Sequence, residues 1–274
     1  MTLRADDQAL LDAIAELSLE AGAAALSIYQ EEFVVEAKPD ASPVTEADRI
    51  GEEIILRGLK RLAPQIPTLA EEAASAGEIP ELGEEFFLVD PLDGTKEFIS
   101  KTGEFTVNIA LVRAGAPVLG VVYAPAIGKL YRGCAGGGAT LSIVKDGAAE
   151  AATPIRCRAP AGAGLIAVAS RSHRSPETDQ FLATLNVADF AAAGSSLKFC
   201  LIAEGLADVY PRLGRTMEWD TGAGQAVLEA AGGRVFEFGG RKPLRYGKSE
   251  RGFDNPHFIA WGAGSACDGK TAER

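Results

Sequence analysis

A short apolar segment that stops at an acidic turn restricts the folds open to this chain. Phe86-Phe87-Leu88-Val89 contains no polar residue, which is typical of a strand buried on both faces. It leads directly into Asp90-Pro91-Leu92-Asp93-Gly94-Thr95, where Pro91 keeps Asp90 out of the helical region. We therefore expect a buried strand that ends at a turn carrying two carboxylates.

The segments around this strand predict helices before it and a β-meander after it. Apolar residues recur every three or four positions over residues 6–32, which indicates a long amphipathic helix. A second helix is expected from Thr45 to Pro64. The apolar runs 105–112 and 118–123 flank Ala114-Gly115-Ala116-Pro117, which predicts an antiparallel hairpin.

The second half of the sequence predicts alternating strands and helices. Strands are expected at residues 165–169, 208–210, 234–238 and 257–261, and helices at 176–185, after the turn 194–196, and at 219–231. This order predicts a layered α+β fold with two lobes. Residues 1–155 would form an N-terminal α+β lobe with most of the acidic motifs, and residues 156–274 a C-terminal α/β lobe.

The composition of the chain excludes several classes of function. The formal net charge of −11 argues against a surface that binds a nucleic-acid polymer. His173 and His257 are the two histidines, so a histidine-rich metal site is excluded, and no G-x-S-x-G nucleophile motif is present. The acidic residues remain, and carboxylates suit hard cations such as Mg²⁺.

The sequence predicts a soluble protein of a reducing compartment. Its apolar stretches are too short for a transmembrane helix, and the first residues do not resemble a signal peptide. The four cysteines are scattered, which favours reduced thiols over a disulfide framework. We therefore expect a cytoplasmic location.

Several acidic residues are candidates for one site, although each also has a structural interpretation. Asp90 and Asp93 flank a free carbonyl at Leu92, yet strings of this type also form simple surface turns. Glu71 follows an apolar segment as the first of two glutamates, which equally suits a solvated strand end. Asp220 and Asp48 precede or open predicted helices, where aspartate commonly serves as a cap.

Taken together, these motifs resemble the inositol monophosphatase family of lithium-sensitive phosphatases. The family carries a Glu-Glu pair, then Asp-Pro-[Ile/Leu]-Asp-Gly-Thr, then Trp-Asp before a late helix that ends in a Gly pair. This chain has Glu71-Glu72, Asp90 to Thr95, Trp219-Asp220 and Gly232-Gly233 in that order. The resemblance spans nearly the whole chain and implies the layered αβαβα fold of sugar phosphatases.

Further segments are similar to the 3′(2′),5′-bisphosphate nucleotidase branch of that family. They are Val44-Thr45-Glu46-Ala47-Asp48, Lys96-Glu97-Phe98-Ile99, residues 103–111, Ser170-Arg171-Ser172-His173, residues 194–200 and Tyr210-Pro211-Arg212. The Gly-rich segment 133–138 departs from the pattern of the family. The resemblance implies hydrolysis of adenosine 3′,5′-bisphosphate to AMP and phosphate, with 3′-phosphoadenylyl sulfate as a second substrate, in sulfate assimilation and nucleotide recycling.

The resemblance also implies two or three Mg²⁺ ions and assigns their ligands. Glu71, Asp90 and the Leu92 carbonyl would hold one ion, and Asp90, Asp93 and Asp220 a second. Two such ions can clamp the attacking and leaving oxygens of a phosphoryl group. Thr95, oriented by Asp48, would activate the water with help from Glu71, and the amides of Gly94 and Thr95 would bind phosphate oxygens.

The residues that would select a nucleotide are predicted at a second set of positions. Arg212 lies where inositol phosphatases place an acid, and a guanidinium there suits a second phosphate. Lys198, Ser196 and Arg171 are further candidates for that phosphate, and His173 for the base or ribose. Each is equally interpreted as an ordinary surface or structural residue.

Two other functions fit the same sequence. One is an inositol-1-phosphate or fructose-1,6-bisphosphate phosphatase on the same scaffold, and the other is a non-catalytic protein that binds phosphonucleotides. The family resemblance also allows a homodimer and peripheral contact with the inner membrane.

Overall fold

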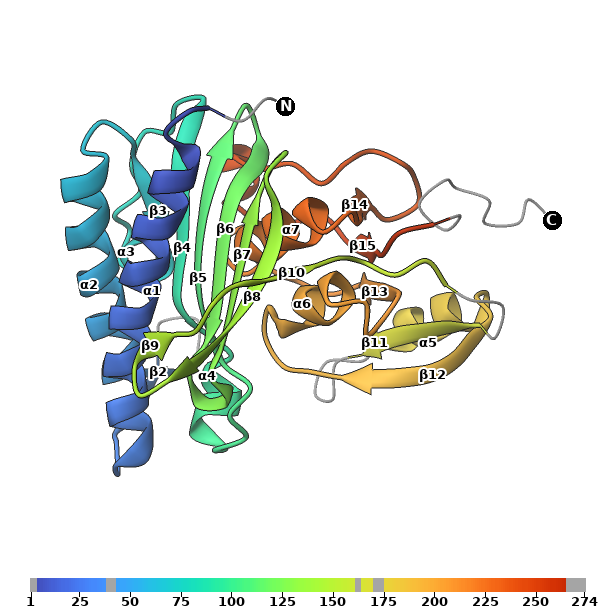
Figure 1. The fold of residues 1–274 in the computed structure, drawn as a ribbon, viewed down its shortest axis with the longest axis horizontal. Helices are drawn as coiled ribbons and strands as arrows, with labels where there is room; N and C mark the ends of the chain where they lie inside the picture. The colour runs from blue at the N-terminus through green and yellow to red at the C-terminus, as the bar shows by residue number, and fades with distance from the viewer. Residues whose placement is uncertain (1–3, 38–42, 161–163, 170–174, 265–274) are drawn as a thin grey trace.

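The polypeptide forms five alternating layers of helices and sheets (Figure 1). The structure is a computed structural model that describes residues 4–37, 43–160, 164–169 and 175–264. Helices α1 (Asp7–Gln30) and α2 (Glu46–Leu62) cover the outer face of a large sheet. Helices α6 (Leu197–Ala203) and α7 (Gly222–Ala230) separate that sheet from a smaller one, which α5 (Pro176–Ala183) covers on its far face. The predicted αβαβα architecture is confirmed.

The large sheet has eight strands and contains the predicted buried strand, residues 86–89, as part of β4. Its order is β10-β8-β7-β6-β5-β4-β3, with β9 paired to β8. The strands are β3 (Thr68–Ala70), β4 (Glu85–Asp93), β5 (Thr106–Arg113), β6 (Ala116–Ala124), β7 (Lys129–Cys134), β8 (Gly138–Lys145), β9 (Ala148–Ala149) and β10 (Thr153–Ile155). The predicted antiparallel hairpin is β5 and β6.

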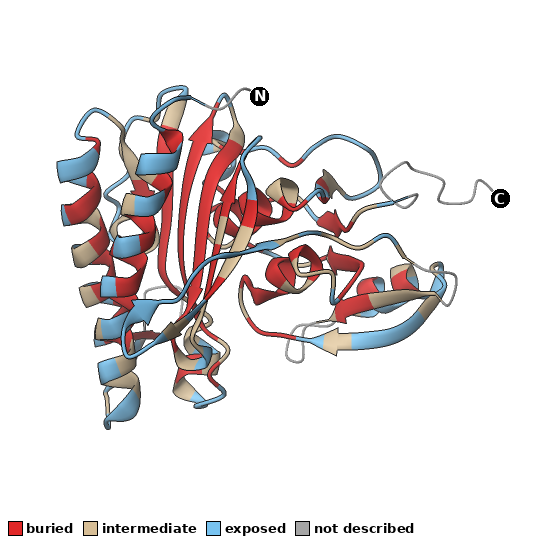
Figure 2. Ribbon diagram, in the orientation of Figure 1, coloured by how far each residue is buried: buried red, intermediate tan, exposed pale blue. Residues whose placement is uncertain are grey.

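Side chains of β4 alternate between two hydrophobic cores. Phe87 and Val89 pack with α1 and α2, whereas Phe86 and Leu88 pack with α6, α7 and the smaller sheet. Figure 2 shows the resulting continuous buried band through β4, β5 and β6. Because helices cover both faces of the sheet, both sets of alternating positions must be apolar. This explains the uninterrupted apolar run before Asp90.

The smaller sheet has five strands in the order β12-β11-β13-β15-β14. They are β11 (Leu165–Ala169), β12 (Val187–Ala192), β13 (Val209–Arg212), β14 (Arg234–Glu237) and β15 (Phe258–Trp261). Sequence analysis missed β12, a mostly exposed edge strand that pairs in parallel with β11. The predicted division into two lobes stays a prediction, although the large sheet ends with β10 and the smaller one begins with β11.

Three short elements complete the surroundings of the acidic motifs. A two-stranded sheet joins β1 (Val35–Ala37) to β2 (Pro43–Thr45), and the helices α3 (Glu71–Ser75) and α4 (Thr95–Ile99) follow β3 and β4. Short 3₁₀ helices occupy Pro125–Ile127 and Ser249–Arg251. Within the described ranges, none of the helices combines the length and apolar character needed to span a bilayer.

Candidate active site

Parallel pairing of β3 and β4 brings Glu71 to Asp90. Ala70 pairs with Val89, so the next residue along each strand is one of these two acids. Neighbouring strands lie about 4.8 Å apart, so two such residues are neighbours in space. The expectation that a strand end carries Glu71 to the acidic turn is confirmed.

A β-bulge sets the direction of Asp93. Residues three apart on a regular strand point to opposite faces of the sheet. Asp90 pairs with Asn108 and Asp93 with Thr106, so β4 uses three steps where β5 uses two. The extra residue turns Asp93 back to the side of Asp90. The sequence motif thus encodes a bulge that gathers two carboxylates.

Asp220 reaches the same place from the other half of the chain. The predicted helix 219–231 begins later, at Gly222, and Thr221 is its N-cap residue. The interpretation of Asp220 as a helix cap is therefore wrong. Its carboxylate Oδ2 instead accepts a hydrogen bond from the backbone N–H of Met217 at 2.8 Å, which fixes the side chain in the preceding turn.

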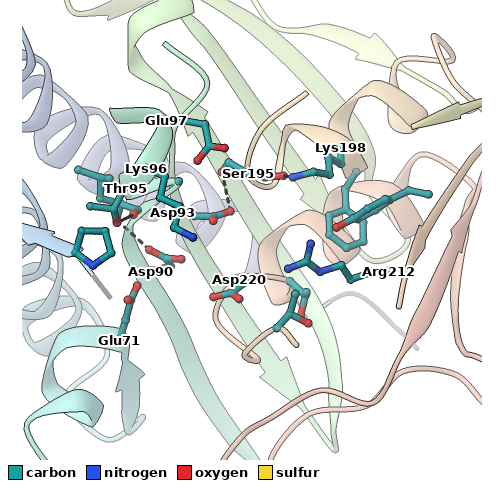
Figure 3. Close-up of a pocket in the computed structure, with 17 residues that line it drawn as sticks. Glu71, Asp90, Asp93, Thr95, Lys96, Glu97, Ser195, Lys198, Arg212 and Asp220 are labelled. Carbon is teal, nitrogen blue, oxygen red and sulfur yellow. Dashed lines mark hydrogen bonds between the residues drawn. The ribbon is translucent and has the colours of Figure 1, made fainter. Parts of the chain in front are cut away.

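The four carboxylates share one cavity (Figure 3). Glu71, Asp90, Asp93 and Asp220 point into it from α3, both ends of the bulge in β4, and the turn before α7. The cavity has a volume of about 290 Å³. It is lined by Pro43, Glu71, Asp90, Leu92, Asp93, Gly94, Thr95, Lys96, Glu97, Ser195, Lys198, Phe199, Tyr210, Arg212, Thr216, Asp220 and Thr221.

The electrostatics of the cluster favour a bound cation. Burial, together with the charges of Glu71, Asp93 and Asp220, raises the pKa of Asp90 well above its ordinary value. Burial and the charges of Asp93 and Glu71 likewise raise the pKa of Asp220. A divalent cation among these carboxyl groups would lower their pKa values again, because its charge favours the ionised form.

The donor set suits Mg²⁺, although the acids are not gathered into a finished cage. Within the described part of the chain, no three acidic, histidine or cysteine side chains are arranged to hold a metal ion as they stand. The carboxyl groups of Asp90 and Glu71 are hydrogen-bonded to each other, so an ion bound between them would replace that contact. Carboxylate oxygens are hard donors of the kind that Mg²⁺ prefers, and Leu92, whose backbone carbonyl is a further oxygen donor, also lines the cavity.

Asp48 orients Thr95 while it also caps α2. Its Oδ2 accepts from the backbone N–H of Thr45 at 2.8 Å and from the Thr45 hydroxyl at 2.7 Å, completing a capping box. Its Oδ1 lies 3.3 Å from Thr95 Oγ1, which is also 3.4 Å from the Leu92 carbonyl oxygen. The capping interpretation of Asp48 is therefore correct, and its orienting role toward Thr95 stays a prediction with which this contact agrees.

Gly94 provides the turn between the bulge and α4. Its φ of 93° lies in the left-handed region, where a side chain would be strained. Helix α4 begins at Thr95, as the sequence suggested. Thr95 and Gly94 therefore line the cavity at the start of a helix.

Two buried carboxylates that sequence analysis missed support the cluster. Glu52 of α2 accepts hydrogen bonds from the backbone N–H groups of Glu72 and Ala73, both at 2.8 Å, and so caps the helix that carries Glu71. Glu218, two residues before Asp220, accepts hydrogen bonds from the backbone N–H groups of Gly247 at 2.7 Å and Lys248 at 2.9 Å. Each lies far in sequence from its partners, so no local pattern indicates the contact.

Cationic side chains line the opposite side of the cavity. Lys198 is buried and donates to the Ser195 carbonyl at 2.9 Å, and burial lowers its pKa. Arg212 donates through Nη2 to the Arg215 carbonyl at 2.9 Å. The buried Nε of Arg212 makes no hydrogen bond with any described residue. Lys96, from the motif after Thr95, also lines the cavity.

Of the remaining predicted substrate residues, Ser196 is the one that the structure describes. Ser196 is buried, and its hydroxyl donates to the Asp220 carbonyl at 2.8 Å, so the neighbouring Ser195 lines the cavity instead. Arg171 and His173 lie outside the described residues. The roles of these three residues in substrate binding stay predictions.

This fold and site define a class of protein, the metal-dependent phosphatases with a layered αβαβα scaffold. The model of the inositol monophosphatase family matches residues 6–266. The chain therefore belongs to the inositol monophosphatase family, whose members are metal-dependent enzymes.

Individual relatives agree with this assignment. The 3′(2′),5′-bisphosphate nucleotidase CysQ of Shigella flexneri is 43% identical over 258 residues, covering 91% of this chain and 98% of that protein. The CysQ protein of Escherichia coli K12 is 42% identical over 251 residues, with the same coverage.

Solved structures show the same scaffold. CysQ from Bacteroides thetaiotaomicron has a TM-score of 0.75 at 41% identity, covering 92% of this chain and 97% of that one. An inositol monophosphatase from Anabaena has a TM-score of 0.73 at 27% identity, covering 95% and 93%.

Proposed function

We propose that this enzyme hydrolyses the 3′-phosphate of adenosine 3′,5′-bisphosphate and yields AMP and inorganic phosphate. The observation that carries the proposal is the two-sided cavity, with four carboxylates facing Lys198 and Arg212. A substrate with two phosphates matches both sides. One phosphate would lie against the acidic cluster with its metal ions, and the other against the cations. The relatives named as bisphosphate nucleotidases support this choice of substrate.

Mg²⁺ is the metal that we propose for the acidic side, as two or three ions. Glu71, Asp90 and the Leu92 carbonyl would hold one ion, and Asp90, Asp93 and Asp220 another. When bound, the ions neutralise phosphoryl charge and lower the pKa of bound water.

Thr95 would handle the proton of the attacking water. Its hydroxyl proton would go to Asp48 Oδ1 rather than to the Leu92 carbonyl oxygen, which would leave an oxygen lone pair available toward the cavity. Thr45 holds the other carboxylate oxygen of Asp48, Oδ2, through two hydrogen bonds, and this fixes the side chain with Oδ1 toward Thr95. Glu71, across the cavity, would accept a proton in turn. Water oxygen bonds to phosphorus, the bond from phosphorus to the ribose 3′-oxygen breaks, and that oxygen takes up a proton.

The polar groups around the phosphates would fix the orientation of the substrate. The backbone amides of Gly94 and Thr95 would donate to the transferred phosphate. Lys198 and Arg212, which both line the cavity, would bind the 5′-phosphate, since charge-assisted hydrogen bonds suit a phosphate. Arg171, Ser196 and His173 are proposed as further contacts to the nucleotide.

Three finer properties belong to the same proposal. A second substrate would be 3′-phosphoadenylyl sulfate, which presents the same 3′-phosphate. The enzyme would act in the cytoplasm, in sulfate assimilation and nucleotide recycling, and would assemble as a homodimer.

Phosphate release tests the proposal. The enzyme with Mg²⁺ is offered adenosine 3′,5′-bisphosphate, 3′-phosphoadenylyl sulfate, inositol 1-phosphate and fructose 1,6-bisphosphate, each with and without Li⁺. We expect Li⁺-sensitive turnover with the highest kcat/KM on the two nucleotides, and loss of turnover in a folded Asp90→Asn variant. A higher kcat/KM on inositol 1-phosphate would refute the substrate assignment, and near-normal activity of Asp90→Asn would refute the metal site.

A further inference from the structure

Ser195 has an unusual backbone conformation in the segment just before α6. Its φ is 54°, in the left-handed region that residues with a side chain seldom adopt. The preceding Gly194 lies so close to Glu104 that a Cβ atom there would come within 2.7 Å of the Glu104 carbonyl oxygen. The segment before α6 is therefore pressed against the segment before β5. Such strain at a cavity wall is typical of functional positions.

The side chain of Ser195 reaches a predicted metal ligand (Figure 3). Its hydroxyl donates to Asp93 Oδ2 at 2.6 Å. Ser195 Oγ is also in close contact with Thr106 Oγ1, whose single proton can go either to Ser195 Oγ or to Asn108 Oδ1, 3.1 Å away. Asn108 Nδ2 also approaches Asp93 Oδ2, at 3.5 Å. The contacts from Ser195 and Asn108 both engage Asp93 Oδ2, so a cation would bind at Oδ1.

Lys198 secures the backbone conformation that makes this contact. Its ammonium donates to the Ser195 carbonyl at 2.9 Å from the first turn of α6. Lys198 is buried, so this bond is shielded from water and is correspondingly strong. It also lies among the cations proposed for the second phosphate of the substrate.

We propose that Ser195 is a positioning residue that presets Asp93 for Mg²⁺, with Lys198 holding Ser195 in place. Hydrogen bonds to the second oxygen of a metal-binding carboxylate fix its orientation before the ion arrives. The inference rests on the proposed function in one respect, the assignment of Asp93 as a metal ligand.

Mg²⁺ titration calorimetry on the metal-free protein tests this role without any substrate. We expect Ser195→Ala and Ser195→Gly to raise the Mg²⁺ dissociation constant by about tenfold or more, the usual effect of such supporting contacts. Ser195→Gly also removes the backbone strain, so its melting temperature should stay level or rise. A purely structural serine predicts the reverse, a lower melting temperature with unchanged Mg²⁺ affinity. Parental Mg²⁺ affinity in Ser195→Gly would overturn the proposal.

Two matched controls separate position from chemistry. Ser142 is a buried serine of β8 without a hydrogen-bond partner among the described residues, and Ala114 has a φ of 47° in the hairpin between β5 and β6. Ser142→Ala and Ala114→Gly should keep parental Mg²⁺ affinity. Equal losses in these controls would overturn the proposal as well.

Lys198→Met tests whether Lys198 holds Ser195 in place, because the two possible answers predict opposite changes in Mg²⁺ affinity. Removing a cation beside an acidic site should tighten Mg²⁺ binding by electrostatics alone. If Lys198 positions Ser195, Mg²⁺ binding should instead weaken severalfold. Unchanged or tighter binding would remove Lys198 from the proposal. None of these experiments measures phosphate release. They would therefore still decide the role of Ser195 if the protein failed to hydrolyse the nucleotide.

Discussion

The Thr95 hydroxyl illustrates how one residue can depend on contacts made elsewhere in the sequence. Its acceptor Asp48 lies 47 positions earlier and is itself held by Thr45. A sequence motif at residues 45–48 indicates a capping box, and only the fold shows that Oδ1 of Asp48 lies at Thr95. Family resemblance predicted the pair, whereas residue spacing alone gave no reason for it.

Substitution of Thr95 should separate proton handling from substrate binding. Thr95→Ala removes the hydroxyl, and we expect kcat to fall by about 10²–10⁴-fold, the range for loss of acid–base assistance. Thr95→Ser retains the hydroxyl and should keep most of the activity. Steady-state kinetics with adenosine 3′,5′-bisphosphate gives both values. If Thr95→Ser is as defective as Thr95→Ala, the hydroxyl has no such role.

Arg212 should determine preference among substrates. Arg212→Glu places an acid beside the proposed 5′-phosphate, and kcat/KM on adenosine 3′,5′-bisphosphate should fall by roughly 30-fold or more, equivalent to about 2 kcal/mol. Any activity on inositol 1-phosphate should change much less. Arg215→Glu is the matched control, because Arg215 is exposed and pairs with Asp254 at 3.1 Å. Equal losses on both substrates would exclude Arg212 from specificity.

At the scale of elements, the sequence predicted what was locally periodic and missed what was not. Helix α1 and strands β5, β6 and β11 carry clear apolar patterns, and their bounds agree with expectation within a few residues. The edge strand β12 is mostly exposed and short of alternating apolar residues, so its sequence reads as a loop. Likewise, nothing in residues 90–93 shows that the turn is a bulge inside a longer strand.

The cap that α2 provides to α3 should matter for the site. Glu52→Gln removes the charge that accepts two backbone N–H groups of α3, and we expect a loss of about 1 kcal/mol in the free energy of unfolding. Because α3 begins at Glu71, Mg²⁺ affinity should also fall. Glu53→Gln, at an exposed position of the same helix, is the control. Urea unfolding and Mg²⁺ titration measure both effects, and unchanged Mg²⁺ affinity in Glu52→Gln would contradict the link.

At the scale of the molecule, the site exists because two sheets share the helical layer between them. Asp90 and Asp93 come from the large sheet and Glu71 from α3 directly after β3, while Asp220, Lys198 and Arg212 come from the segments around α6, α7 and β13. Element order predicted the layers. Which turns meet across them depends on the strand order of both sheets, and that order is not written in any local segment of the sequence.

The raised pKa values of Asp90 and Asp220 predict how metal and pH together affect stability. A carboxyl whose pKa is raised in the fold stabilises it fully below the ordinary value of 3.8. That contribution is lost as pH rises through the raised pKa. Mg²⁺ should offset the loss by binding the ionised form.

The difference in melting temperature between Mg²⁺-loaded and EDTA-treated protein should therefore grow as pH rises from acidic to neutral. Asp7 and Asp208 have a lowered pKa, which their hydrogen bonds to arginine produce against the opposing effect of burial. Both sit outside the cavity, so their effect cancels in the difference. Thermal denaturation at a series of pH values provides the measurement. A difference that stays constant with pH would contradict the assignment of these acids to a metal site.

Anomalous diffraction from a crystal soaked in Mn²⁺, which binds carboxylates much as Mg²⁺ does, tests the convergence of the acidic side chains most directly. We expect at least two anomalous peaks inside the cavity, with Asp90 between them and Glu71, Asp93 and Asp220 turned toward them. Peaks elsewhere on the molecule, or carboxylates that stay turned away from the ions, would contradict the metal-dependent phosphatase described above.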